Sequence, residues 1–270
     1  MNTENYWRVL MSILDKNQLF KNRSPKWERP FETLREKWGE IPTTRDGRMK
    51  TTELLKLSDK DLLKEWSRGK LSRTTDTEFD IRGWYHVLYS DILKGKKVMD
   101  VGSGFAFDGI TYAQNGAKVT FVDIVEDNLR VVRRLCEFLE LANVEFLFLK
   151  DIDSLKDLDY DYDVIYAAGS LHHAPSSVIK PEAMELLKHL RCGGRWIQLA
   201  YPYTRWLKEG ELPFNKWGEK TDGFGTPWAE WYDIPKLLKL LEPAKFDVVL
   251  CKEFNNSDCI WFDLIYRGRD

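Results

Sequence analysis

A glycine-containing turn follows a short apolar stretch near the middle of the chain. Residues 97–101 form the stretch, and Gly102, Ser103 and Gly104 follow it before a helical pattern begins. Glycine lets the backbone approach a ligand closely, and the first turn of the following helix offers free N–H groups. The turn therefore predicts a ligand site, with a plain turn as the alternative. A dinucleotide-binding turn is disfavoured because Phe107 stands where that pattern needs its last glycine, and a P-loop is excluded because its lysine is absent.

An acidic residue ends the next apolar stretch, which runs from Val119 to Asp123. A carboxylate at the end of the second strand of such a unit can accept hydrogen bonds from both ribose hydroxyls of a nucleoside. The alternative is a helix N-cap or a solvent-facing loop acid. Together with the glycine turn, Asp123 favours a ligand that contains a nucleoside.

Two adjacent histidines, His172 and His173, come shortly after a further apolar stretch that ends at Ala168. Histidine can take a proton near neutral pH because its unperturbed pKa is about 6.5. We therefore predict that His173 is a general base and that His172 assists it, with a structural role in contact with a backbone carbonyl as the alternative. A metal site is not expected, because adjacent residues rarely present both rings to one ion.

Short apolar stretches alternate with helical patterns from residue 79 onward. Alternation of this kind predicts a parallel sheet with helices on both faces. The predicted strands are residues 97–101, 119–123, 144–149, 163–168 and 195–200. Two more strands, residues 246–254 and 259–267, flank a turn and are expected to pair antiparallel. Residues 1–78 show no strand pattern and predict a helical cap, with helical spacing of apolar residues at 6–14 and another helix starting after Ser58. Helices are also predicted near residues 181–190 and at residues 234–241.

The order and spacing of these features resemble the class I S-adenosylmethionine-dependent methyltransferases that act on small molecules. The family pattern is D-x-G-x-G-x-G, and Ala106 stands here in place of the last glycine. The resemblance covers residues 79–200 and the last two strands. It implies a Rossmann-like, doubly wound, seven-stranded and mostly parallel sheet whose last strand is antiparallel. It also implies S-adenosyl-L-methionine as the cofactor.

The resemblance further implies which residues hold that cofactor. They are Asp100, Gly102, Ser103, Gly104, Asp123, Ile124, Asp151, Ile152 and Gly169. The turn would lie under the methionyl part, Asp123 would hold the ribose and Ile124 would pack on the adenine. Asp151 would reach the adenine amino group with Ile152 beside it, although Asp151 could also be one loop acid among several.

Residues 201–233 interrupt the alternation and are rich in tryptophan, tyrosine, proline and glycine. A wall of aromatic and polar side chains suits a sugar or another hydroxylated metabolite. The candidate acceptor-binding residues are Tyr201, Tyr203, Arg205, Trp228 and Trp231. A hydrophobic lid packed on the N-terminal cap is the alternative for most of these rings. We treat residues 79–270 as one methyltransferase domain that carries this segment as an insertion.

The expected reaction is O-methylation of a small hydroxylated acceptor. Methylation of an amine, a nicotinamide-dependent oxidoreductase and a catalytically silent cofactor-binding protein are the alternatives. A nucleic-acid acceptor is not expected, because the segment after residue 168 reads Gly-Ser-Leu and lacks the Pro-Pro-aromatic run of nucleic-acid amino methyltransferases. The net charge of -2 agrees with this expectation.

Composition limits the remaining classes. The chain has 270 residues, of which 43% are hydrophobic and 31% charged, which is typical of a folded globular protein. No apolar run reaches the length of a membrane span, and charged residues interrupt the first twenty positions, so neither a membrane anchor nor a signal peptide is expected. The four cysteines show no zinc or redox spacing and predict a reduced, cytoplasmic protein. The oligomeric state stays open.

Overall fold

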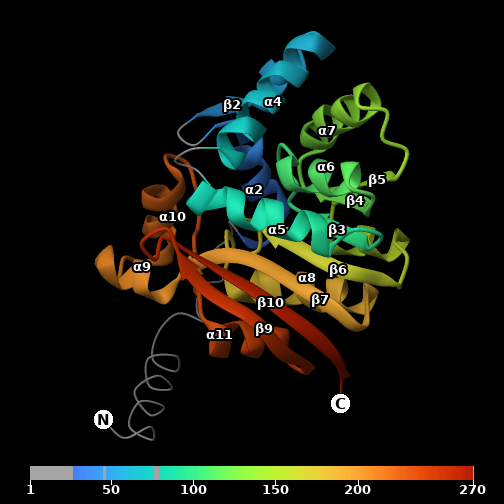
Figure 1. Ribbon diagram of the computed structural model, residues 1–270. Coiled ribbons are helices and arrows are strands. Elements are labelled where there is room, and N and C mark those ends of the chain that lie inside the picture. The colour runs from blue at the N-terminus through green and yellow to red at the C-terminus, as the bar shows by residue number, and fades with distance from the viewer. Residues whose placement is uncertain (1–26, 45–46, 76–78, 270) are drawn as a thin grey trace, which may run out of the picture.

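The computed structural model describes residues 27–44, 47–75 and 79–269, and a mixed β-sheet forms its centre (Figure 1). The parallel strands are β3 (Lys97–Val101), β4 (Lys118–Asp123), β5 (Val144–Phe148), β6 (Tyr162–Ala168) and β7 (Leu190–Pro202). The last two strands, β9 (Ala244–Phe254) and β10 (Cys259–Arg269), form a hairpin, and β10 pairs antiparallel with β7. The spatial order is β5-β4-β3-β6-β7-β10-β9, which confirms the predicted doubly wound sheet with an antiparallel last strand.

Helices cover both faces of this sheet. The helices of the main domain are α5 (Trp84–Ile92), α6 (Phe107–Gln114), α7 (Glu126–Phe138), α8 (Ser176–His189) and α11 (Ile234–Leu241), with a short helix η4 (Ile152–Asp157) between β5 and β6. Figure 1 shows α5, α6 and α7 on one side of the sheet and α8 and α11 on the other. The strand order reverses between β3 and β6, and in such sheets a ligand binds at this point, beyond the carboxyl ends of the strands.

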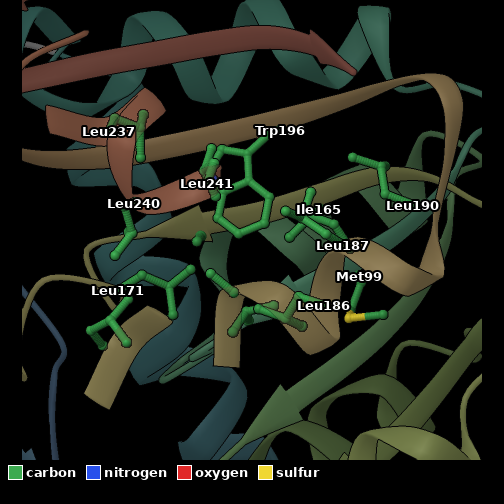
Figure 2. Close-up of a cluster of buried hydrophobic side chains, with 14 of the residues drawn as sticks. Met99, Ile165, Leu171, Leu186, Leu187, Leu190, Trp196, Leu237, Leu240 and Leu241 are labelled. Atoms are coloured by element: carbon green, nitrogen blue, oxygen red, sulfur yellow. The ribbon is translucent and has the colours of Figure 1, made fainter. Parts of the chain in front are cut away.

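Two hydrophobic cores follow from the alternation of side chains along the strands. In β6, Val164 and Tyr166 contribute to the core under α5 and α6, whereas Ile165 contributes to the core under α8 and α11. Figure 2 shows the second core, in which Trp196 of β7 lies among leucines of α8 and α11. Because both faces of β3, β4 and β6 are buried, these strands are mostly apolar, which explains why they were predictable from sequence.

The N-terminal part of the described chain is mainly helical but also contains a hairpin. It comprises α2 (Pro30–Trp38), α3 (Thr51–Leu54), α4 (Asp59–Thr74) and η3 (Phe79–Gly83), together with β1 (Glu40–Pro42) and β2 (Arg48–Lys50). Ser58 caps α4 by accepting a hydrogen bond from the N–H of Asp61, as predicted. The prediction that no strand occurs before residue 80 is wrong, because strands of three residues are too short to show an alternating pattern. The helix suggested by apolar spacing at residues 6–14 lies outside the described residues.

The segment 201–233 folds into short elements at the carboxyl end of the sheet. These are α9 (Tyr203–Lys208), α10 (Phe214–Asp222) and β8 (Trp231–Tyr232), of which β8 adds to β7 (Figure 1). Helix α8 begins at Ser176, five residues earlier than Pro181, where the sequence suggested its start. Within the described ranges, no helix is long and apolar enough to cross a membrane.

Candidate active site

A cavity of about 730 Å³ lies at the carboxyl ends of β3, β4, β6 and β7. The N-terminal elements and the segment 201–233 close it from above. Trp38, which ends α2, packs its ring on His173 at 4.4 Å, and Arg48 of β2 forms an ion pair with Asp222 of α10 at 3.3 Å. Lys37 donates a hydrogen bond to the carbonyl of Phe224 at 3.0 Å. The cap and the inserted segment therefore meet directly over the cavity.

The glycine turn forms the floor of the cavity. Gly102 and Gly104 have φ angles of 75° and 55°, which favour glycine. A Cβ atom on Gly102 would also clash with the side chain of Ser170, which follows β6. The hydroxyl of Ser103 donates a hydrogen bond to the carbonyl of Asp100 at 3.0 Å and so fixes the turn. The position at which the family pattern has a third glycine is also left-handed, because Ala106 has a φ of 50°.

Asp123 lies beside this turn and is almost completely buried. Its carboxylate accepts hydrogen bonds from the N–H of Gly104 at 3.0 Å, the N–H of Val125 at 2.8 Å and the amide of Asn128 at 3.3 Å. Burial raises the pKa of Asp123 to about 6, although these hydrogen bonds oppose the shift. Asp123 therefore connects the turn to α7 and keeps one face on the cavity.

Asn128 was not predicted, although it joins the cap to the ligand site. Its side-chain oxygen accepts a hydrogen bond from the Thr51 hydroxyl at 2.7 Å, and its amide nitrogen donates to the carbonyl of Trp38 at 3.2 Å. An asparagine early in a helix has no sequence signal for this role, because its partners Thr51 and Trp38 lie 77 and 90 residues away in the chain.

The remaining predicted cofactor residues divide into two groups. Asp100, Ile124 and Gly169 line the cavity together with the turn and Asp123. Burial, and then the nearby Asp108 and Asp123 carboxyls, raise the pKa of Asp100 well above its usual value.

Asp151 and Ile152 are not among the residues that line the cavity. Instead, Asp151 caps η4 by accepting hydrogen bonds from the backbone and side chain of Ser154. Close by in the chain, the carbonyls of Ile124 and Leu149 accept hydrogen bonds from Arg35 of α2, at 2.5 and 3.1 Å.

The two histidines lie side by side under the roof, with ring centroids 4.1 Å apart. Nδ1 of His173 donates a hydrogen bond to the carbonyl of Trp228 at 3.2 Å, because a carbonyl can only accept. The neutral ring therefore has its lone pair on Nε2. Burial lowers the pKa of His173, and the Asp222 carboxylate opposes this only in part. Burial lowers the pKa of His172 still further, and neither of its ring nitrogens has a hydrogen-bond partner among the described residues.

Asp222 organises the wall beside His173. It accepts hydrogen bonds from the Tyr201 and Thr221 hydroxyls, both at 2.8 Å, and its Oδ2 lies 4.0 Å from Nδ1 of His173. Burial alone would raise the pKa of Asp222, but His173, the two hydroxyls and Arg48 together lower it. A carboxylate at this distance stabilises a protonated His173 by charge. Asp222 was not predicted, because it is one of several acids in this segment of the chain.

Only some of the predicted acceptor-binding residues line the cavity. Tyr201 and Arg205 line the cavity, and the Arg205 guanidinium lies 4.4 Å from the centre of the Tyr201 ring. Tyr203, Trp228 and Trp231 do not line it. Tyr203 and Trp231 pack on each other at 4.7 Å within an aromatic cluster of the inserted segment itself. Within the described ranges, no group of three His, Cys, Asp or Glu side chains could hold a metal ion.

Comparison with known proteins places this site in a family. Residues 98–194 match the family model described as a methyltransferase domain. The ubiquinone biosynthesis O-methyltransferase of Acinetobacter baylyi is 32% identical over 90 residues, which cover 33% of this chain and 38% of that protein. The ribosomal RNA small subunit methyltransferase G of Clostridium perfringens is 26% identical over 198 residues, which cover 69% of this chain and 80% of that protein. The match to the first of these relatives thus spans well under half of its length.

Three solved structures share the fold. PH0226 protein from Pyrococcus horikoshii OT3 has a TM-score of 0.56 at 20% identity, covering 73% of this chain and 95% of that one. The magnesium protoporphyrin IX methyltransferase of Synechocystis PCC 6803, with bound SAH, has a TM-score of 0.52 at 21% identity, covering 72% and 88%. The [4+2]-cyclase SpnF has a TM-score of 0.54 at 14% identity, covering 73% and 85%.

The sheet order, the glycine turn and the acid after β4 define the class I methyltransferase fold. With the match over residues 98–194, this part of the chain is recognised as a methyltransferase domain, in agreement with the predicted family.

Proposed function

We propose that the protein transfers the methyl group of S-adenosyl-L-methionine to a small hydroxylated metabolite, such as a sugar, by O-methylation. One observation carries this proposal. A single cavity is lined by the glycine turn, Asp123 and His173, and because Nδ1 of His173 donates to the Trp228 carbonyl, the neutral ring has its lone pair on Nε2. The cofactor supplies an activated methyl group, so the protein has mainly to hold the acceptor in line with it. We also propose that residues 1–78 act as a cap and residues 201–233 as the acceptor-binding segment.

The cofactor fits the residues at the floor. Gly102 and Gly104 would lie under the methionyl part, Asp123 would hold the ribose and Ile124 would pack on the adenine, and all four residues line the cavity. The cofactor is a cation at its sulfonium centre. A nearby cation would favour the ionised form of Asp100, which burial and the nearby Asp108 and Asp123 carboxyls disfavour.

His173 supports transfer to a hydroxyl. Its lowered pKa keeps the ring neutral at pH 7, so Nε2 can take the proton that the acceptor oxygen loses. Asp222 then stabilises the imidazolium across 4.0 Å. Arg48, Tyr201 and Thr221 hold that carboxylate in place. Transfer to an amine nitrogen is the second candidate, since a neutral histidine can accept the proton of an ammonium group as well.

Other reactions and other classes of methyl acceptor would give different results in the experiments described below. The similarity to a [4+2]-cyclase shows that this fold does not by itself fix the reaction. The relative that acts on ribosomal RNA makes a nucleic-acid acceptor a competing class. We favour a small molecule because the cap and α10 bond to each other directly over the cavity.

Titration calorimetry tests cofactor binding. We expect S-adenosylmethionine and S-adenosylhomocysteine to bind, and Asp123→Ala to weaken binding by about 1–3 kcal/mol because the ribose hydroxyls lose a charged acceptor. Binding of a nicotinamide dinucleotide in place of both would overturn the proposal. Screening hydroxylated metabolites, amines and RNA fragments for a mass increase of one methyl group, with the cofactor present, then identifies the acceptor class.

A further inference from the structure

Helix α8 places a carboxyl group at the cavity without any polar partner. Ile179 and Glu182 lie three residues apart on α8, so they share one face of the helix, and both line the cavity. Glu182 is only 6% exposed. Among the residues that the structure describes, none forms a hydrogen bond or an ion pair with its carboxyl group. A buried polar group without a partner costs stability, so this carboxyl group is expected to find its partner in a ligand.

One end of helix α2 lies near the start of α8. The Trp27 ring, which precedes α2, packs on the Trp228 ring with the two centroids 6.0 Å apart. The Trp228 indole donates a hydrogen bond to Glu230 at 3.3 Å, and Glu230 accepts another from the Ser176 hydroxyl at 2.6 Å. Because Ser176 is the first residue of α8, these contacts connect the beginning of α2 to the beginning of α8.

The second half of α2 reaches the ends of β4 and β5. Arg35 bonds there to the carbonyls of Ile124 and Leu149. Phe31, one turn before Arg35, lines the cavity and therefore covers the part of it between α8 and the ends of these two strands. Glu182 lies in the second turn of α8, and α8 packs against η4, which closely follows Leu149 in the chain. Its carboxyl group therefore belongs to this part of the cavity.

The same part of the cavity is the place for the base of a nucleoside. The glycine turn, Asp123 and Leu149 lie at the ends of three adjacent strands, β3, β4 and β5. The N–H of Leu149 donates to the carbonyl of Asp123 at 2.9 Å. A ligand with its ribose at Asp123 and its methionyl part over the turn extends its base toward Leu149. The other lining side chains from α2 and α8 include the apolar Phe31, Leu34 and Ile179, which suit the flat faces of a base.

We propose that Glu182 recognises the adenine base of the cofactor by accepting a hydrogen bond from its exocyclic amino group. This inference rests on the proposed function and names the residue that selects the base. The sequence resemblance assigns this contact to Asp151, whose carboxylate instead accepts hydrogen bonds from Ser154. Burial raises the pKa of Glu182 to about 7, but the carboxyl group keeps an accepting oxygen whether it is protonated or ionised.

The test compares S-adenosylhomocysteine with its deamino analogue, in which purine replaces adenine. Titration calorimetry on the full chain measures both dissociation constants. We expect the wild type to bind S-adenosylhomocysteine about three- to tenfold more tightly than the analogue, because one hydrogen bond is lost. Glu182→Met should abolish this preference, whereas Glu182→Gln should keep it, because the amide oxygen also accepts. Glu185→Met is the matched control, since Glu185 lies on the same helix but bonds to Lys188 and does not line the cavity.

Thermal unfolding of the unliganded chain gives a second readout. Glu182→Met replaces a buried carboxyl group without a partner by an apolar side chain of similar length. The midpoint of unfolding should therefore equal or exceed that of the wild type. A lower midpoint would assign Glu182 to the stability of the fold and would overturn the inference.

The binding results separate this inference from the proposed function. Equal affinity of the wild type for both ligands, or an unchanged preference in Glu182→Met, would overturn the inference while leaving the proposed function in place. A wild type that does not bind S-adenosylhomocysteine would overturn the proposed function and the inference with it.

Discussion

Burial of Asp123 disfavours the ionised form of its carboxyl group. Burial raises its pKa to about 6 in the folded chain, above its usual value of 3.8. A proton on this carboxyl therefore persists to higher pH in the folded than in the unfolded chain, and its ionisation as the pH rises through 6 costs stability. Ribose hydroxyls that donate to the carboxylate favour the charged form, so ligand binding should release a proton.

If ligand binding releases a proton from Asp123, the affinity for the cofactor must depend on pH. We expect the affinity for S-adenosylhomocysteine to rise with pH up to about 6 and to level off above it, with a slope approaching tenfold per pH unit on the acid side. Calorimetry at several pH values, in buffers of different ionisation enthalpy, measures both the slope and the released proton. Asp123→Asn cannot ionise and should bind weakly but without this slope. A slope that persists in Asp123→Asn would assign the effect to another group, such as Asp100.

His173 is expected to govern the rate and not the binding of the cofactor. A positioned base contributes about 10²–10⁴-fold, so His173→Ala should lower turnover by that order while cofactor affinity stays nearly unchanged. His172→Ala should lower it less, because both ring nitrogens of His172 are buried. The measurement is turnover against pH once an acceptor is known.

The direction in which the rate should change with pH also follows from the pKa of His173. Because burial lowers the pKa of His173, the rate should fall only on the acid side, below the usual histidine range. Asp222→Asn removes the carboxylate that raises this pKa, so the acid limb should move to still lower pH. A rate without any ionisation between about pH 5.5 and 8, together with full activity of His173→Ala, would mean that proximity alone carries the reaction.

At the scale of elements, helix α4 is held against α6 by a glycine. A Cβ atom on Gly69 would lie 2.5 Å from Cζ of Phe107 and would also clash with the carbonyl of Thr43. Alanine is intrinsically the better helix former by about 1 kcal/mol, so a helix without tertiary contacts would be stabilised by this change. In this fold, Gly69→Ala should instead destabilise by about 1–3 kcal/mol because the core is overpacked.

Chemical denaturation of Gly69→Ala beside Ser67→Ala measures this effect. Ser67 is exposed on the same helix, so its replacement changes helix propensity without adding a clash. Equal stability of both variants would show that α4 can move away from α6 at little cost. Such an outcome would weaken the description of residues 27–75 as a cap docked on the main domain.

At the scale of the molecule, the cap and the inserted segment are tied to each other across the site. Lys37 bonds to the carbonyl of Phe224, whose side chain is 93% exposed and presents a chymotrypsin site. Ligand in the cavity should hold both parts in place, so cleavage at Phe224 should slow in the presence of S-adenosylhomocysteine and acceptor. Tyr160, 60% exposed in the connection between η4 and β6, serves as the internal control. Unchanged cutting at Phe224 would indicate a roof that does not respond to ligand.

The strands, the order of the main helices and the residues of the glycine turn could be predicted from the sequence, because each depends on local patterns. Strands buried on both faces are mostly apolar, and helix α11 was predicted with its observed bounds, Ile234–Leu241. The turn residues and Asp123 follow strands directly, so predicting β3 and β4 also placed them at the ligand edge.

Only the tertiary structure decided which distant polar residues meet there. Asp222 of α10 lies 4.0 Å from Nδ1 of His173, and Gly83 lets the backbones of η3 and α4 touch at the carbonyl of Arg73. Asp151 instead caps η4, while Arg35, more than one hundred residues earlier in the chain, donates to the carbonyl of Leu149. A local pattern determines the secondary structure of a segment and the face on which a side chain lies. It carries no information on a partner that loop closure brings from elsewhere, and such partners set the charge and the pKa values of this site.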